Sequence, residues 1–455
     1  MPFSGFSLGG TSSLSPDRDG GESHVNAVTP VRVPGIRDSA GRRARWMIAS
    51  MDLEFVRAVD KALDGREGRR LGLDFTRGSL PPPWGARLLT VDRLMDMLTY
   101  RTMTRTGQVL VLQQGSFLPP KRFMTSRTTR GEELEMVDTH RLGLLLREGC
   151  QVVVGGIEKI DPVFDIACRA LQWLTGARVY ATAFLATGEA GGFNLHVDTS
   201  DSLVLQLEGT KSWQVRGESM KAPLNEVRRS AEPSEEILWE GTLGPGEAMS
   251  VPRGYWHTAT RSDQGAGGYS LHVTFGVVRR TGVDWLRALT ELACNLEVFR
   301  RDLTDDTDED EALAAALSLL ARTYRPTHFL QARTAYSDRG GIGWRETQHP
   351  YTGGAFGPVS EVVCLTDFPP HLTAGGGNAV VTVNGRRLTF PAEALPALRL
   401  LVSGRPVVVE EVSRTTGVDA AELVRPLLDA HFCTEVTGAL AGAFTALDGP
   451  ESPES

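Results

Sequence analysis

The feature that most constrains this chain is a series of short, strand-like segments between Val179 and Val278. Each segment alternates in polarity or is rich in β-branched residues, and Gly, Pro or charged residues bound it. In chain order the segments read VYATAFLA, SLVLQLEG, KSWQVRG, EILWEGTL, EAMSVPRG and YSLHVTFGV. So many short strands within one stretch predict a β-barrel or a β-sandwich.

Helix-forming sequence flanks this stretch on both sides, so the fold class is α+β. Residues 107–115 predict a buried strand, and residues 137–157 predict a helix, a Gly stop and a strand. The acidic run 305–311 lacks the Gly that a calcium loop needs, and we interpret it as a solvated connector that starts a helix. Apolar residues recur at helical spacing over 52–63, 91–100, 162–176, 283–299 and 311–324.

The C-terminal part shows a sequence pattern different from that of the β region. Residues 378–390 predict a hairpin that turns at Asn384-Gly385, and three short helices are expected over 394–432, in the manner of a winged helix. Residues 404–433 carry three arginines against five acidic residues, whereas phosphate contacts require the opposite balance. We therefore expect packing or assembly from this module and not direct DNA binding.

Composition narrows the class of protein. A chain of 455 residues exceeds a single compact core, and its net charge of -8 disfavours nucleic acid or lipid as the main partner. The sequence has no apolar run long enough for a membrane span and no secretory signal pattern, and its five cysteines are scattered. We expect a cytoplasmic protein. Residues 1–45, with five arginines between Arg32 and Arg45, predict a disordered arm; an anionic partner for that arm is the alternative.

Three residues of the β region are candidate metal ligands. His196 and Asp198 are two apart, so on a strand both side chains leave the same face. His257 follows the Pro-Arg-Gly turn of VPRGYWHTA, at the start of a late strand. Alone, the HxD pair is a weak signal and could be a surface pair. Two histidines and one carboxylate, however, leave three octahedral positions open, as Fe(II) oxygenases require, while a structural zinc site would want four closed ligands.

A lysine and a polar strand face extend this candidate site. Lys211 shares a strand face with Trp213 and Val215, and a lysine pointing into an apolar barrel is costly unless it meets an anion such as the distal carboxylate of 2-oxoglutarate. The alternative is a lysine at a turn, exposed to water. On a later strand, Ser270 and Thr274 are candidate co-substrate contacts. His272 shares their face, and we interpret it as a satisfied core histidine.

These motifs carry a family resemblance. The HVD triplet at 196–198, LVLQLEGTKSWQV, the PRGYWH turn and YSLHVTFG resemble the JmjC class of Fe(II)/2-oxoglutarate oxygenases, and within it the ribosomal oxygenases, which hydroxylate protein side chains. The resemblance implies a double-stranded β-helix core and iron bound by His196, Asp198 and His257. It also implies 2-oxoglutarate gripped by Lys211 with help from Thr274, and Tyr180 in the place of a family Asn or Tyr.

The sequence and the resemblance together predict an organisation and a function. The sequence predicts a disordered arm (1–45), which has no counterpart in the family, and a disordered tail (446–455). Between them, the resemblance implies an oxygenase domain (46–280), a helical dimerisation region (281–365) and a winged-helix-like domain (366–445). The expected activity uses Fe(II), 2-oxoglutarate and O₂ to hydroxylate a polypeptide, possible substrates including a ribosomal protein. The same chemistry on a free amino acid or a natural-product peptide stays open, as does a non-catalytic cupin-like binding or assembly protein.

Overall fold

A computed structural model describes residues 51–448, apart from 67, 69–70, 82–83, 101–106, 130–131, 189–191, 225–231, 261–267, 305–306, 334–358 and 384–385. All of these residues belong to one compact unit, Ile48–Ser455. The expected disordered arm (1–45) and residues 449–455 of the expected tail lie outside the described residues. In the part of the chain that is described, no helix is long and apolar enough to cross a membrane.

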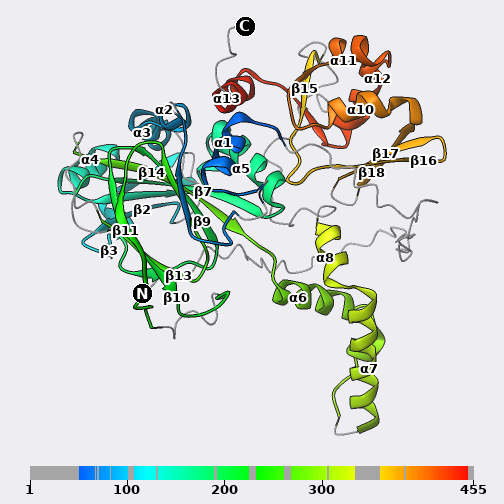
Figure 1. The fold of residues 1–455 in the computed structure, drawn as a ribbon, viewed down its shortest axis with the longest axis horizontal. Coiled ribbons are helices and arrows are strands. Elements are labelled where there is room, and N and C mark those ends of the chain that lie inside the picture. The colour runs from blue at the N-terminus through cyan, green and yellow to red at the C-terminus, as the bar shows by residue number, and fades with distance from the viewer. Residues whose placement is uncertain are drawn as a thin grey trace. The chain divides into compact units, whose positions relative to one another are not determined.

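The central part is built from two antiparallel sheets, as Figure 1 shows. The larger has eight strands in the order β1-β12-β9-β14-β7-β6-β2-β3, and the smaller has four in the order β11-β10-β13-β8. All six segments expected between 179 and 278 are strands, so the predicted barrel is confirmed as a cupin-type fold. The bounds are β1 (Thr76–Ser79), β2 (Val109–Gln113), β3 (Ser116–Phe117), β6 (Gln151–Gly155), β7 (Arg178–Ala186), β8 (His196–Val197), β9 (Asp201–Glu208), β10 (Lys211–Glu218), β11 (Ile237–Leu243), β12 (Glu247–Val251), β13 (Tyr255–Thr260) and β14 (Ser270–Val278).

Strand alternation separates the two faces of the larger sheet. On β7 and β14, residues such as Ala183 and Phe275 pack into the main apolar core, which also includes Phe164 of the helix α5 (Pro162–Thr175). Asp161 begins that helix by accepting hydrogen bonds from the next N–H groups, and Gly176 ends it at φ +62°. The alternate residues of β7 and β14 therefore face the interior of the barrel, where the candidate site lies.

The remaining elements before the barrel agree with the sequence pattern. The expected helices over 52–63 and 91–100 are present, and residues 137–157 contain the expected helix followed by β6. The β4–β5 pair is a separate hairpin. The bounds are α1 (Glu54–Ala62), α2 (Trp84–Leu88), α3 (Val91–Tyr100), the 3-10 turn η1 (Pro120–Arg122), β4 (Met124–Thr129), β5 (Glu132–Val137), α4 (Thr139–Arg147) and the 3-10 turn η2 (Ile157–Lys159).

Three helices follow the barrel: α6 (Gly282–Ala293), α7 (Thr307–Thr323) and α8 (Pro326–Arg333). Thr281 and Asp284 form a capping box that starts α6. The expected single helix over 283–299 is wrong in its second half. Asn295 donates to the carbonyls of Glu291 and Leu292 and ends the helix, and only the short 3-10 turn η4 (Glu297–Phe299) follows. The acidic run does start a helix, because three of its acids lie in the first turn of α7.

The C-terminal part contains the three expected helices and the expected hairpin. Strands β17 and β18 pair with Val383 opposite Arg386, while the turn residues 384–385 themselves lie outside the described residues. The three-stranded sheet β19-β15-β20 accompanies the helices. The bounds are β15 (Glu361–Cys364), β16 (His371–Gly375), β17 (Asn378–Val383), β18 (Arg386–Pro391), the 3-10 turn η5 (Ala392–Ala394), α10 (Leu395–Leu401), β19 (Val407–Val408), α11 (Val409–Thr416), α12 (Ala420–Asp429), β20 (Cys433–Glu435) and α13 (Gly438–Asp448).

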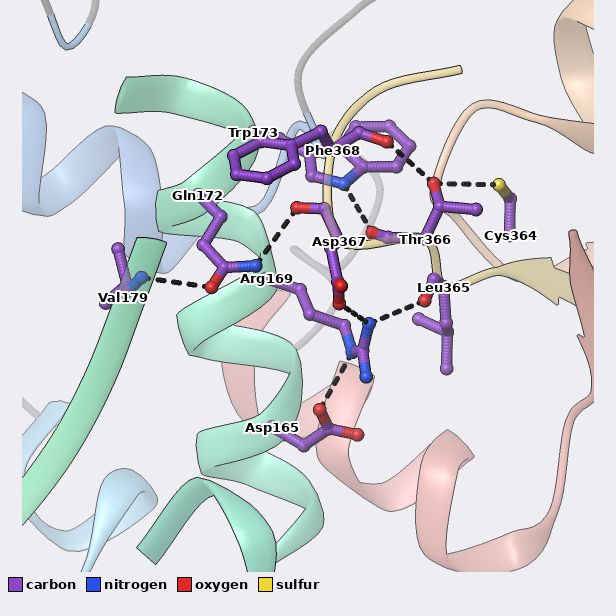
Figure 2. Close-up of polar contacts among 10 residues, drawn as sticks. All are labelled: Asp165, Arg169, Gln172, Trp173, Val179, Cys364, Leu365, Thr366, Asp367 and Phe368. Atoms are coloured by element: carbon purple, nitrogen blue, oxygen red, sulfur yellow. Dashed lines mark hydrogen bonds and ion pairs between the residues drawn. The ribbon is translucent and has the colours of Figure 1, made fainter. Parts of the chain in front are cut away.

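A buried polar network joins helix α5 to the segment after β15, as Figure 2 shows. Arg169 donates to Asp165 at 2.8 Å, to Asp367 at 3.0 Å and to the carbonyl of Leu365 at 2.7 Å. The Trp173 indole donates to the carbonyl of Thr366 at 2.8 Å. Because a buried guanidinium must keep these partners, the C-terminal part is packed against the barrel's helix and is not attached only by a linker.

Candidate metal centre

The two candidate histidines are direct neighbours across a strand pair. Strand β8 pairs with β13 in a register that places His196 opposite His257, and their ring centroids lie 4.3 Å apart. Asp198 lies two residues beyond His196, and its Oδ2 is 3.6 Å from His257 Nε2. Ligand atoms of all three residues lie within 4.8 Å of one another. The structure thus brings together the three residues that the sequence predicted as one cluster.

Hydrogen bonds orient both imidazoles in the same way. His196 Nδ1 lies 2.8 Å from the carbonyl oxygen of Asn194, and His257 Nδ1 lies 3.2 Å from that of Tyr255. A carbonyl can only accept, so Nδ1 carries the proton in each ring and Nε2 keeps a free lone pair. This is the arrangement by which proteins present histidine to a metal ion.

The electrostatic surroundings keep His257 neutral. Burial lowers its pKa to about 4, the nearby His196 contributes in the same direction, and Asp198 opposes them. A neutral imidazole is the form that binds metal. Ser202 donates a hydrogen bond to Asp198 Oδ2 at 3.3 Å, and the Gly254 N–H donates to the Asp198 carbonyl at 3.0 Å. These hydrogen bonds help to hold the three candidate ligand residues close together.

Lys211 lies inside the barrel, as its strand face predicted, and the exposed alternative is wrong. It is 2% exposed, and its Nζ donates to Gln151 Oε1 at 3.1 Å. Gln151 opens strand β6, and its amide packs closely on Gly192, where an added Cβ would lie 2.2 Å from Oε1. Gly192 belongs to the loop that leads into β8. The lysine's partner is thus packed against the segment that carries the metal ligands.

His272 corrects one interpretation from the sequence. It is a core residue, 3% exposed, with its ring stacked on Phe184 at 4.6 Å and edge-on to Trp213 at 5.4 Å. It is not satisfied, however, because its Nδ1 has no hydrogen-bond partner among the described residues. Burial and the charge of Lys211 lower its pKa well below the usual 6.5, so the ring is neutral. Trp213 Nε1 is also unpartnered in the described part of the chain.

The other predicted site residues lie at different depths. Ser270 Oγ accepts a hydrogen bond from Gln206 at 3.0 Å, and Thr274 pairs across the sheet with Thr182 of β7. Tyr180 lies at the opposite end of β7 from Ala186, which pairs with Gln151. Six residues of strand separate the two positions, roughly 20 Å. The structure therefore groups Ser270 with the lysine end and places Tyr180 away from it.

Tyr180 instead lies beside the metal ligands. Its ring is 36% exposed, but its hydroxyl lies among protein atoms and forms a 3.1 Å hydrogen bond with Ser200. Burial raises its pKa to about 12, and the charge of Asp198 contributes. The ring rests on Gly276, where an added Cβ would lie 2.2 Å from it. A glycine directly opposite on β14 is therefore what allows the aromatic ring to lie there.

Sequence reasoning missed Gln151, Gly192 and Gln206. Gln151 precedes the apolar run VVV, and nothing in that pattern marks it as more than the start of a strand. Gln206 lies within LVLQLEG, where its polarity in a buried strand was the available signal. It is fully buried, and its Oε1 is unpartnered among the described residues.

The residues present fit both a metal ion and an anionic co-substrate. Two imidazole nitrogens and one carboxylate oxygen are the donor set of an open iron site and not of a closed zinc site. A buried ammonium together with unpartnered polar atoms on Trp213 and His272 leaves hydrogen-bonding capacity for a bound anion. The same interior thus offers a metal-binding end and an anion-binding end.

Comparison with known families agrees with this geometry, since a profile of the JmjC domain matches residues 162–284. Residues 162–284 are a JmjC domain. The matched range contains all three ligand residues and Lys211, whereas Gln151 lies before it. The JmjC match therefore covers the central strands and not the C-terminal part.

Two relatives are similar to part of this chain. Ribosomal oxygenase 1 of Rattus norvegicus is 31% identical over 174 residues, which cover 36% of this chain and 28% of that protein. The bifunctional lysine-specific demethylase and histidyl-hydroxylase NO66 of Caenorhabditis briggsae is 32% identical over 142 residues, covering 30% of this chain and 17% of that protein. The chain thus spans less than a third of the length of these relatives.

A solved structure is similar to a larger part of this chain. It is that of Escherichia coli YcfD, with a TM-score of 0.48 and 14% identity, covering 81% of this chain and 96% of that one. A related structure is described as the ribosomal oxygenase YcfD from Escherichia coli, at a TM-score of 0.44 and 14% identity, with 77% and 91% covered.

Proposed function

We propose that this chain is an Fe(II)- and 2-oxoglutarate-dependent dioxygenase that hydroxylates a side chain of a protein or peptide. The observation that carries the proposal is the pairing of two features on one barrel interior. One is the cluster of His196, Asp198 and His257 with both Nε2 atoms free, and the other is the buried Lys211. A non-catalytic barrel protein would gain nothing from burying a lysine beside unpartnered polar atoms.

We propose that residues at different depths in the barrel bind the iron and the 2-oxoglutarate. His196, Asp198 and His257 would hold the iron. When bound, iron and 2-oxoglutarate use O₂ to convert the co-substrate to succinate and CO₂ and to hydroxylate a C–H bond. Lys211 would pair with the distal carboxylate of the co-substrate, where exclusion of water strengthens the charge pair. Thr274 and Ser270 lie on the same interior face and would assist from β14.

The residues around Lys211 have defined tasks in this proposal. Gln151 would orient the ammonium through its 3.1 Å contact. His272 stays neutral because burial and Lys211 lower its pKa, so it can take part in hydrogen bonding without adding a second positive charge. Tyr180 lies on the other side of the ligands, and we assign it to the polypeptide substrate instead of the co-substrate. Its hydroxyl stays protonated at neutral pH and can donate a hydrogen bond.

A ribosomal protein is the substrate class that we propose first. The relatives of this chain are named ribosomal oxygenase and histidyl-hydroxylase. The test is incubation of the protein with Fe(II), ascorbate, 2-oxoglutarate and O₂, with succinate measured. Ribosomal proteins from the same cells are then searched by mass spectrometry for the gain of one oxygen. No succinate above the His257→Ala control would refute the activity. Succinate coupled only to a free amino acid or a small peptide would refute the ribosomal substrate.

We also propose that helices α6–α8 form a self-association region. Leu289 is buried between the helices, whereas Leu292 and Leu296 are 38% and 40% exposed. Further exposed leucines of this segment are Leu286, Leu303, Leu317, Leu319 and Leu330. Such a concentration of exposed leucines is unusual on a monomer surface, and a second copy of the same patch is the simplest partner that would cover it.

Light scattering tests this assembly proposal. The wild-type protein should be a dimer at micromolar concentration, and the double variant Leu292→Glu with Leu296→Glu should be a monomer with unchanged helix content. Leu144 of α4 is 40% exposed, so Leu144→Glu is a matched control that should stay dimeric. A wild-type monomer refutes the proposal. Leu289 is unsuitable for this test because it packs inside the segment.

For the C-terminal part, we propose a winged-helix-like domain that serves packing and not DNA binding. Three short helices and the sheet β19-β15-β20 support the first part of this assignment. The acidic balance over 404–433 and the buried contact of Arg169 with Asp367 support the second. We keep the boundary between 280 and 281. For the C-terminal domain we propose Glu361–Asp448 in place of 366–445, because β15 pairs with β19 and β20 and α13 ends at Asp448. Unchanged mobility of a DNA duplex at low salt is the expected result of a binding assay.

A further inference from the structure

We propose that Asp201 is a positioning residue that holds the turn before His257 against the segment of Asp198, and so sets metal affinity; this inference rests on the proposed function. Asp201 begins strand β9, three residues after Asp198, and is 2% exposed. Its Oδ1 accepts a hydrogen bond from the Arg253 N–H at 3.1 Å. Arg253 lies in the Pro-Arg-Gly turn, four residues before the ligand His257.

The His257 strand, β13, is held by a long pairing with β10, in which Val215 lies opposite His257, whereas the pairing that joins it to the His196 strand is short. The link between the two ligand segments is therefore where a further support matters. Strand β8 has two residues and pairs with β13 only through Trp256 opposite Val197 and His257 opposite His196. A second link is the hydrogen bond from the Gly254 N–H to the Asp198 carbonyl at 3.0 Å. Asp201 adds a third, charged link from the neighbouring strand. Metal affinity falls when ligand atoms shift by about 1 Å, so this third link bears on the site itself.

The surroundings of Asp201 are built to fix its carboxylate. Arg279 Nε donates to Oδ2 at 2.7 Å, and the same guanidinium also donates to the carbonyl of Leu71. Gly72, at φ +77°, packs so closely that an added Cβ would lie 2.6 Å from Asp201 Cβ. Both carboxylate oxygens therefore have named donors, and Gly72 packs directly against the side chain. An anion this deeply buried is retained at a cost, which fits a requirement for its position.

The competing explanation is that Asp201 stabilises the fold and nothing more. Asp165 offers a matched control, because it is also buried and ion-paired, with Arg169 Nε at 2.8 Å, but it lies on α5 in the network of Figure 2 and contacts no metal ligand there. A purely structural role predicts that Asp201 and Asp165 variants both lower the melting temperature and leave the metal affinity of the folded protein unchanged. A positioning role predicts that the Asp201 variant alone changes affinity.

The experiment is an anaerobic titration of the metal-free full chain with Co(II), followed by visible absorption well below the melting temperature. We expect Asp201→Ala to weaken Co(II) binding about tenfold or more, as loss of an outer partner commonly does. Asp201→Asn keeps an acceptor for the Arg253 N–H and should recover part of this loss. Asp165→Ala should bind Co(II) within twofold of the wild-type protein.

Three outcomes separate the possibilities. If folded Asp201→Ala binds Co(II) within twofold of wild type, the inference is overturned. If Asp201→Ala does not fold, the near-isosteric Asp201→Asn decides: unchanged affinity overturns the inference, and weakened affinity with a normal circular dichroism spectrum supports it. If the wild-type protein itself gives no Co(II) spectrum that His257→Ala removes, the proposed metal site fails instead, and the two failures are thereby distinguished.

Discussion

The two ends of the barrel interior differ in how far their polar atoms are hydrogen-bonded within the protein. At the metal end, each imidazole Nδ1 already has a carbonyl partner, so only the ligand atoms remain free. At the lysine end, Lys211 is buried and polar atoms of Trp213 and His272 have no partner among the described residues. The metal end thus fixes the positions of the three candidate ligand residues. The lysine end instead supplies polar groups that can bind an anion.

The strongest test of this contrast removes a ligand. His257→Ala should weaken metal binding by at least about a hundredfold and abolish succinate formation, because a three-ligand site loses both donor and geometry. Isothermal titration with Co(II) and a succinate assay measure the two effects. His140 is exposed, and His140→Ala is the matched control that should change neither. Wild-type turnover by the His257 variant would show that the metal assignment is wrong.

A second change should separate the two ends. Lys211→Ala should raise the 2-oxoglutarate concentration needed for half-maximal turnover by about ten- to a hundredfold, the equivalent of a charge-assisted hydrogen bond of roughly 1.5–3 kcal/mol. Metal affinity should stay unchanged, since Lys211 donates to Gln151 and is not one of the three candidate ligands. The exposed Lys121 provides the control Lys121→Ala. Identical 2-oxoglutarate titrations for the Lys211 and Lys121 variants would contradict the role of this lysine.

The third test concerns the unsatisfied state of the lysine end. His272→Leu removes a buried polar atom that lacks a partner, which relieves a cost of about 1–3 kcal/mol in the metal-free protein. The melting temperature of the free protein should therefore rise or stay level, while the apparent affinity for 2-oxoglutarate falls about three- to tenfold. A differential scanning measurement with and without 2-oxoglutarate reads both. A variant that is less stable and binds 2-oxoglutarate normally would favour simple packing.

The smallest expected effect is a change of folding stability with pH. Burial and Lys211 lower the pKa of His272 below 6.5, so below pH 6.5 the unfolded chain takes up a proton that the folded chain does not. Stability then rises with pH, and between pH 5.5 and 6.5 this residue should contribute about 1 kcal/mol of the change. Denaturant unfolding of the wild type and His272→Leu at both pH values measures it. His257, whose pKa is lowered to about 4, adds the same slope to both proteins. Equal pH dependence of the two proteins would contradict a buried neutral His272.

The sequence by itself determined the strands and most helices, and it named the three residues that the structure brings together as candidate ligands. Short alternating segments can satisfy their pattern only as strands with one buried face, and the spacing of His196 and Asp198 fixes their common side. Likewise, the alternation of Lys211 with Trp213 and Val215 predicted the buried lysine correctly. These inferences held because they depend on strand periodicity, which is a local property of the chain.

Tertiary structure alone decided which distant residues meet. The register of β8 with β13 places His196 opposite His257 across 61 residues of chain, and no local pattern specifies that register. The partner of Lys211 is Gln151 and not a residue near it in sequence, and whether His272 finds a partner depends on strands packed around it. The position of Tyr180 also depends on tertiary structure. Strand β7 runs along the whole interior, so Tyr180 at one end lies by the candidate metal ligands and the other end lies by the lysine.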